Sequence, residues 1–151
     1  MNQGIIGFHV SRDYLKKKGA TIEEHIEAAK KKFAIPKLKV VQIFTGPPQN
    51  FTFSIKEEGE KSLREYIERT GMTVIAHGRY FEVPFSTQVK PSILHFMERE
   101  WKVAKRSGIK GIVLHLYRYP KEIVTEKLLE LELDPDVKII LETPAIAPDK
   151  A

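Results

Sequence analysis

Five short apolar runs recur along the chain, and each of them leads into a polar or ionisable residue. They occupy residues 5–8, 40–44, 73–76, 109–114 and 137–141, and the residues that follow them are His9, Thr45, His77, His115 and Glu142. Runs of this length, rich in β-branched and aliphatic residues, are typical of strands buried in a parallel sheet. The pattern therefore predicts five strands, at least three of which end in side chains able to bind a metal.

Four patterns with helical spacing lie between these runs. Thr21 and Glu24 have the form of a capping box and predict the start of the first helix, and Ser54 and Glu57 have the same form before the second. Pro91 and Pro120 suit the first turns of the third and fourth helices. The positions predicted to face the core are Ile22, Ile26, Ala29 and Phe33 in the first helix and Ile123, Leu128 and Leu131 in the fourth.

The strict alternation of strands and helices predicts the fold class. Five parallel strands and four helices indicate an α/β fold built from the repeating unit of a (β/α) barrel. A full barrel has eight such units and typically ~250 residues. With 151 residues, the chain is expected to form a single domain, residues 1–151, that supplies part of a TIM barrel.

Composition narrows the class of protein. No cysteine is present, which excludes disulfides and thiolate metal sites, and no apolar run approaches the ~18 residues of a membrane span. With no signal-peptide pattern either, we expect an intracellular protein, cytoplasmic or nuclear, with no membrane partner. The formal charge of +5 favours a polyanionic partner such as nucleic acid, although a solvated lysine-rich surface explains the charge alone equally well.

The strand ends carry the candidate chemistry. In βα barrels the carboxyl ends of the strands meet at one mouth, so His77, His115 and Glu142 are expected to lie together. Two imidazoles and a carboxylate form a recognised ligand set for catalytic zinc. The alternative is a set of hydrogen-bonded histidines at the mouth. His9 ends the first strand at the same mouth, where it suits a supporting or substrate-binding role.

Two helical histidines and an aromatic loop complete the candidates. His25 and His95 lie within helical patterns and are expected to be surface or half-buried residues. The segment 78–85 follows His77 and contains an arginine and three aromatic residues: Arg79, Tyr80, Phe81 and Phe85. Exposed aromatic rings can stack on nucleic-acid bases, whereas buried ones cap the core below a loop. The sequence leaves both roles open for these rings.

Five segments in order resemble the endonuclease IV family, the class II apurinic/apyrimidinic (AP) endonucleases. Gly7-Phe8-His9-Val10-Ser11 is similar to the family's first strand, and Ile43-Phe44-Thr45 with Gln49 to its second strand and the loop after it. Ala76-His77-Gly78-Arg79-Tyr80 resembles its His-x-x-Tyr segment. The segments Gly111-Ile112-Val113-Leu114-His115 and Ile140-Leu141-Glu142-Thr143 resemble its fourth and fifth strand ends. Val83-Pro84 after Tyr80, together with residues 108–116, most resembles the forms encoded by large DNA viruses.

The resemblance implies a zinc enzyme that cleaves DNA 5′ to an abasic site. His77 and His115 would bind one zinc, and Glu142, the expected catalytic residue, would bridge it to a second. Tyr80 would enter duplex DNA beside the lesion, and Gln49, Arg79 and His9 would lie at the DNA interface. The family site holds up to three zinc ions, but its later ligands have no counterpart after Glu142. At most one or two ions can therefore be ligated by this chain.

The missing ligands leave other interpretations open. We expect a truncated form, inactive alone, that associates with another copy or with a complementing C-terminal half. A non-catalytic relic or a DNA-binding or interaction module would bind DNA without metal and with salt-sensitive affinity. A sugar-isomerase-like barrel would bind a small polyol and not duplex DNA.

Overall fold

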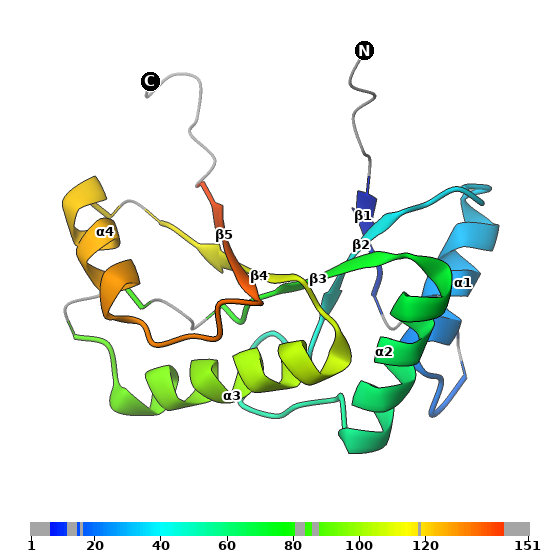
Figure 1. Cartoon of the computed structure of the whole chain (residues 1–151), viewed down its shortest axis with the longest axis horizontal. Coiled ribbons are helices and arrows are strands. Elements are labelled where there is room, and N and C mark those ends of the chain that lie inside the picture. The colour runs from blue at the N-terminus through cyan, green and yellow to red at the C-terminus, as the bar shows by residue number, and fades with distance from the viewer. Residues whose placement is uncertain are drawn as a thin grey trace, which may run out of the picture.

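The structure, a computed structural model, describes residues 7–11, 15, 17–80, 84–85, 88–117 and 119–143. Within these residues five strands alternate with four helices (Figure 1). The strands are β1 (Gly7–His9), β2 (Val40–Phe44), β3 (Thr73–His77), β4 (Gly111–His115) and β5 (Lys138–Glu142). The helices are α1 (Ile22–Lys32), α2 (Glu57–Thr70), α3 (Pro91–Ser107) and α4 (Lys121–Glu130).

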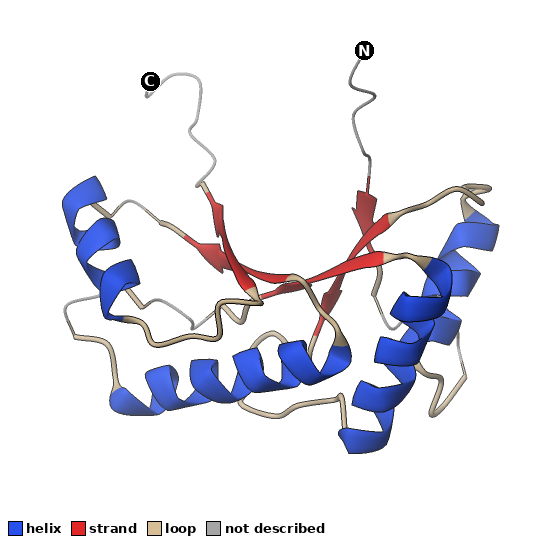
Figure 2. Ribbon diagram, in the orientation of Figure 1, coloured by secondary structure: helices blue, strands red, loops and turns tan. Residues whose placement is uncertain are grey.

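All five strands are parallel and lie side by side in chain order, β1-β2-β3-β4-β5. The sheet is curved, and the four helices lie around its outer face (Figure 2). In the part of the chain that the structure describes, the concave face carries no helix. This is the arrangement of part of a (β/α) barrel, which confirms the predicted fold class.

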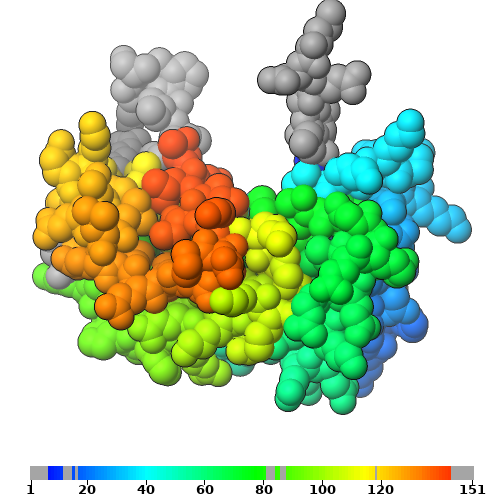
Figure 3. All heavy atoms as spheres, in the orientation of Figure 1, coloured from blue at the N-terminus to red at the C-terminus, as the bar shows by residue number. Residues whose placement is uncertain are grey.

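The core lies between the sheet and the helices. Because successive strand residues point to opposite faces, Val41 and Ile43 of β2 and Val74 and Ala76 of β3 are buried on the helix side. They belong to one apolar cluster with residues of α3, including Trp101. Side chains of the helices cover this outer face (Figure 3). Side chains at the alternate positions, which include His77, point to the concave face.

The first helix begins as the sequence predicts, and the second does not. The Glu24 amide donates to the Thr21 hydroxyl, and the Thr21 amide donates to the Glu24 carboxylate at 2.8 Å, which completes the capping box. In contrast, α2 begins at Glu57 behind Lys56, which makes no side-chain cap. The prediction of a second capping box at Ser54 is wrong, because the Ser54 amide instead pairs with the Thr45 carbonyl and ties down the preceding loop.

The predicted core positions at the two ends of the sheet are less buried than expected. Phe33 caps the end of α1 and is 47% exposed, with its ring edge against Phe8. In α4 Val124 is the buried position, and the predicted inward residues are only half-buried. These helices flank the outer strands and have less sheet to cover. No helix in the described residues has the length and apolarity needed to cross a membrane.

Candidate metal centre

The carboxyl ends of β3, β4 and β5 bring His77, His115 and Glu142 together. His115 lies opposite Glu142 in the β4–β5 pairing, and His77 lies opposite Val113 in the β3–β4 pairing. Nε2 of His77 is 3.2 Å from Oε2 of Glu142, and Nε2 of His115 is 3.5 Å from the same oxygen. One ligand atom from each residue lies within 4.8 Å of the others. The three strand ends therefore converge on one point.

This spacing fits a shared metal ion. Ligands bound at the usual zinc distances in tetrahedral geometry are separated by about 3.3 Å. The two separations from Glu142, 3.2 and 3.5 Å, lie on either side of this value, and the ligand atoms all lie within 4.8 Å of one another. The donor set of two nitrogens and one oxygen also leaves a fourth position free in a tetrahedral site. The residues present thus fit zinc.

The ring contact of His77 and the lowered pKa of His115 suit the same role. Nδ1 of His77 lies 2.8 Å from the Gly78 carbonyl, so in the neutral ring Nδ1–H donates there and the Nε2 lone pair faces Glu142. Burial lowers the pKa of His115, the nearby His77 lowers it further, and Glu142 opposes the shift. A lowered pKa favours the neutral imidazole, which is the form that binds metal.

Aromatic rings surround the cluster. The Phe44 and His77 rings are 5.1 Å apart, and the Tyr80 and His115 rings are 5.6 Å apart. The His9 ring also contacts Phe44, at a ring distance of 4.9 Å, and its Nδ1 is 3.3 Å from the Gln42 side-chain nitrogen. Burial, followed by the neighbouring His77, lowers the pKa of His9. His9 is therefore near the mouth but outside the three-residue cluster.

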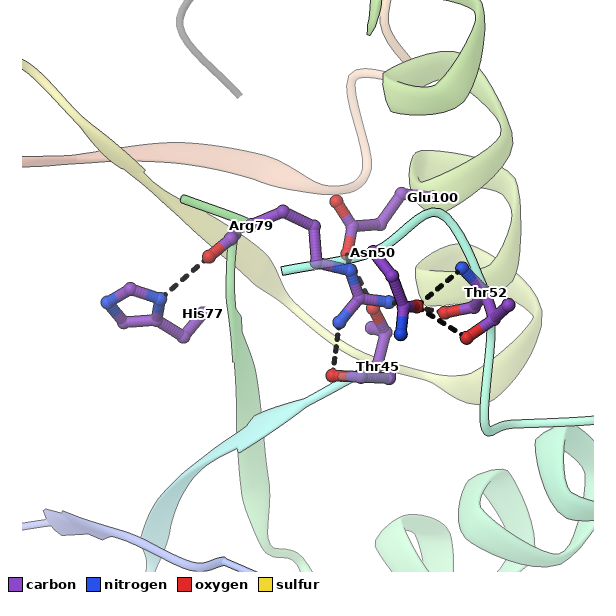
Figure 4. A network of polar contacts seen from close by, with 8 residues as sticks. Thr45, Asn50, Thr52, His77, Arg79 and Glu100 are labelled. Carbon is purple, nitrogen blue, oxygen red and sulfur yellow. Dashed lines mark hydrogen bonds and ion pairs between the residues drawn. The ribbon is translucent and has the colours of Figure 1, made fainter. Parts of the chain in front are cut away.

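The structure corrects the prediction that Arg79 lies at a DNA interface. Its side chain is completely buried, and it lies beside Glu100 of α3 (Figure 4). The guanidinium donates to the carbonyls of Gly46 and Thr52, the latter at 3.1 Å, and its Nε lies 3.9 Å from Glu100. A guanidinium held in this way cannot also reach a phosphate. Arg79 instead braces the loop between β2 and α2.

The buried partner of Arg79 was missed by the sequence interpretation. Glu100 is completely buried and accepts a hydrogen bond of 2.5 Å from the Thr45 hydroxyl, which stands at the end of β2. The sequence nevertheless contains a signal for this buried carboxylate. Glu100 shares the face of α3 that carries Met97, Trp101 and Ala104, all buried. A carboxylate on an otherwise apolar helical face predicts a buried cation or hydroxyl partner.

The exposed candidates lie next to one another. The Tyr80 amide donates to the carbonyl of Pro48 at 3.1 Å, so Tyr80 is held beside the turn that carries the exposed Gln49. Tyr80 itself is 48% exposed. Phe85 is completely buried and belongs to the core, whereas Phe81 lies outside the described residues.

The two helical histidines have different environments. His95 is exposed, as expected. The expectation for His25 is wrong, because it is only 4% exposed, and its Nδ1 accepts a hydrogen bond from the Leu15 amide. Leu15, which precedes α1, therefore lies beside this ring.

Comparisons with known proteins show what the chain is similar to. No family model matches the chain. A probable AP endonuclease of African swine fever virus is 36% identical over 106 residues, which are 70% of this chain and 36% of that protein. The crystal structure of AsfvAP:AG superposes with a TM-score of 0.82 at 31% identity, over 93% of this chain and 48% of that chain.

More distant structures share the fold alone. Endonuclease IV from Thermus thermophilus superposes with a TM-score of 0.65 at 19% identity. The superposed part is 95% of this chain and 53% of that chain. A xylose isomerase domain protein from Planctomyces limnophilus has a TM-score of 0.59 at 18% identity, over 97% of this chain and 56% of its own. The chain thus has the fold of the xylose-isomerase-like TIM barrels. Within that class it has an endonuclease IV-like fold in a form similar to the viral AP endonucleases. It spans about a third to a half of the length of these relatives.

Proposed function

We propose that this chain provides the first metal site and part of the DNA-binding surface of a zinc-dependent AP endonuclease, which hydrolyses the phosphodiester 5′ to an abasic site. The observation that carries the proposal is the convergence of His77, His115 and Glu142 beside the half-exposed Tyr80. The likeness to viral proteins named as probable AP endonucleases supports the same substrate.

His77, His115 and Glu142 would hold the first zinc ion. When bound, zinc lowers the pKa of a bound water and neutralises charge on a phosphate oxygen. Glu142 has a second carboxylate oxygen, which suits it to reach a further ion, so this chain would ligate one or two of up to three ions. The Gly78 carbonyl fixes the ring of His77, and such supporting contacts strengthen metal affinity.

The surrounding residues would bind the substrate. Tyr80 and the turn bearing Gln49 protrude beside the cluster, and His9 lies at the same mouth. Phe44 packs against His77 and would support the position of this ring at the metal. The net charge of +5 favours association with a polyanion, and an intracellular location follows from a DNA substrate.

Further strands are part of the same proposal. Among the described residues β1 pairs only with β2, and β5 pairs only with β4, so both outer strands present an unpaired edge. Unpaired edges of parallel sheets favour strand addition. We infer that these edges pair with the remaining strands of a barrel, from a complementing half or from a second copy.

The competing function is a DNA-binding module without chemistry. The observation that favours it is that, among the described residues, a single three-residue cluster has metal-ligand geometry, whereas the proposed enzyme uses up to three ions. A polyol-binding barrel has less support, because its solved relatives share only the fold and Tyr80 offers an exposed aromatic ring to a base.

The test measures zinc binding, DNA binding and nicking by the purified chain. We expect one or two zinc ions per chain, lost in Glu142→Gln and retained in Glu58→Gln, a matched exposed glutamate in the first turn of α2. Nicking 5′ to a single abasic site that disappears with chelator and in Glu142→Gln would support the enzyme. Zinc-dependent preference for the abasic duplex without nicking would place the remaining chemistry on other strands. DNA binding that ignores zinc and the lesion would favour the non-catalytic module.

A further inference from the structure

Tyr117 has a backbone conformation that bulky residues rarely adopt. Its φ is 49°, and among the described residues the other non-glycine residue with positive φ is Ala34, which follows the end of α1. The left-handed conformation costs an L-residue with a Cβ roughly 1–2 kcal/mol. Tyr117 lies two residues beyond His115, in the loop that leaves the candidate metal centre.

Burial does not offset this cost, since 42% of Tyr117 is exposed. The conformation instead fixes the ring in one place. The Tyr117 ring is 5.8 Å from the His115 ring, and its hydroxyl donates to the Tyr80 carbonyl at 3.2 Å. Strained residues that gain no burial are typical of binding and catalytic sites.

This hydrogen bond also completes the anchoring of Tyr80. The Tyr80 amide donates to the Pro48 carbonyl, and the Tyr80 carbonyl accepts from Tyr117, so its backbone is held on both sides. The two tyrosine rings lie 5.6 and 5.8 Å from the ring of His115, and both are about half-exposed. We call Tyr80 and Tyr117 the tyrosine pair.

We propose that the tyrosine pair is a stacking platform for an unpaired DNA base beside the metal centre, with Tyr117 as a substrate-positioning residue. The proposal rests on the proposed function and adds to it a residue in the loop after β4. An intact duplex hides the faces of its bases within the stack, whereas an abasic site leaves the opposite base without a partner. Exposed tyrosine rings held by hydrogen bonds can stack on such a base with little loss of side-chain entropy.

The experiment compares the binding of abasic and intact duplexes by fluorescence polarisation, with zinc present, alongside thermal unfolding of each variant. Tyr117→Asn and Tyr117→Gly both accept positive φ and remove the ring. We expect each to weaken abasic-duplex binding about 5- to 100-fold. Binding of the intact duplex should change by less than about two-fold, because phosphate contacts dominate it. The melting temperature should not fall with Tyr117→Gly, because the strain is relieved.

Two further variants serve as controls. Tyr117→Phe keeps the ring and loses the hydrogen bond to Tyr80, so its affinity should lie between those of the wild type and Tyr117→Asn. Phe33→Leu alters another half-exposed aromatic residue, at the end of α1, and should leave both affinities unchanged.

The outcomes separate the two proposals. If the wild type prefers the abasic duplex and Tyr117→Asn keeps the full preference, the platform is wrong while the proposed function stands. Equal losses on both duplexes, in step with a lower melting temperature, would make Tyr117 a structural residue. A wild type without any abasic preference would overturn the proposed substrate and the platform with it.

Discussion

At the scale of single residues, the buried pair of Arg79 and Glu100 links the loop between β2 and α2 to helix α3. Both side chains are completely buried, and the Arg79 guanidinium binds two carbonyls of the loop that carries Gln49. Gly46 permits this approach, because a Cβ there would lie 2.6 Å from Nη2 of Arg79 and would clash with the Thr52 carbonyl oxygen. A buried ion pair adds little net stability, but it specifies one arrangement of its neighbours. Here it fixes the loop beside Tyr80.

Removing one member of this pair should destabilise the fold. We expect Arg79→Met to lower the free energy of unfolding by about 3–5 kcal/mol, because the Glu100 carboxylate would stay buried without a cation. The double variant Arg79→Met with Glu100→Gln removes the charge and should recover a large part of this loss. Urea denaturation of the single and double variants gives the coupling energy. A coupling near zero would show that the two side chains act independently.

These residues also show which part of the site the sequence could not reveal. The regular placement of His77, His115 and Glu142 after apolar runs predicts a shared site, because parallel strands end at one edge. Arg79 stands in an equally polar context beside Tyr80, and only the loop that folds over it makes it buried. His25 is similarly buried, and it accepts a hydrogen bond from the amide of Leu15, ten residues before it in the chain. Loop paths depend on long-range contacts, which local patterns do not encode.

At the scale of elements, the β4–β5 pairing positions the metal centre. Gly111 begins β4 opposite Lys138, and His115 ends β4 opposite Glu142. A Cβ at Gly111 would lie 2.9 Å from Cδ1 of Ile140 and 3.0 Å from the Lys138 carbonyl oxygen. A side chain there would push β5 away at the strand's start. The distance between His115 and Glu142 depends on the same pairing.

Gly111→Ala should therefore weaken zinc binding as well as stability. We expect zinc affinity to fall about ten-fold or more, as for residues that orient metal ligands. Isothermal titration with zinc and urea denaturation measure the two effects. Gly59→Ala is the matched control, because its Cβ meets only Ile55 at 3.6 Å within helix α2. It should raise stability by about 0.5–1 kcal/mol and leave zinc binding unchanged. Equal zinc affinities in the two variants would show that zinc binding does not depend on the β4–β5 pairing.

At the scale of the whole molecule, the three-residue cluster, His9 and the tyrosine pair all lie at the carboxyl end of the sheet. The alternation of apolar runs and helical patterns was enough to predict the parallel βα sheet and the site at this end, because right-handed βα units leave few other arrangements. Helix boundaries were less predictable. Ser54 carries the sequence form of a cap, but its amide pairs with the Thr45 carbonyl and the helix begins three residues later. Net charge, in contrast, is a property of the entire chain and carries no information about this geometry.

Charge and metal centre should accordingly contribute separately to DNA binding. The chain has a formal charge of +5, so intact-duplex affinity should fall steeply as salt rises from about 50 to 200 mM, with chelator present or absent. Chelation should leave this slope unchanged and remove the preference for an abasic duplex, because the metal centre and the tyrosine pair form one surface. Polarisation titrations over this salt range, with and without chelator, measure both quantities. Loss of intact-duplex binding on chelation would mean that the metal ions, and not the lysine-rich surface, hold the phosphate backbone.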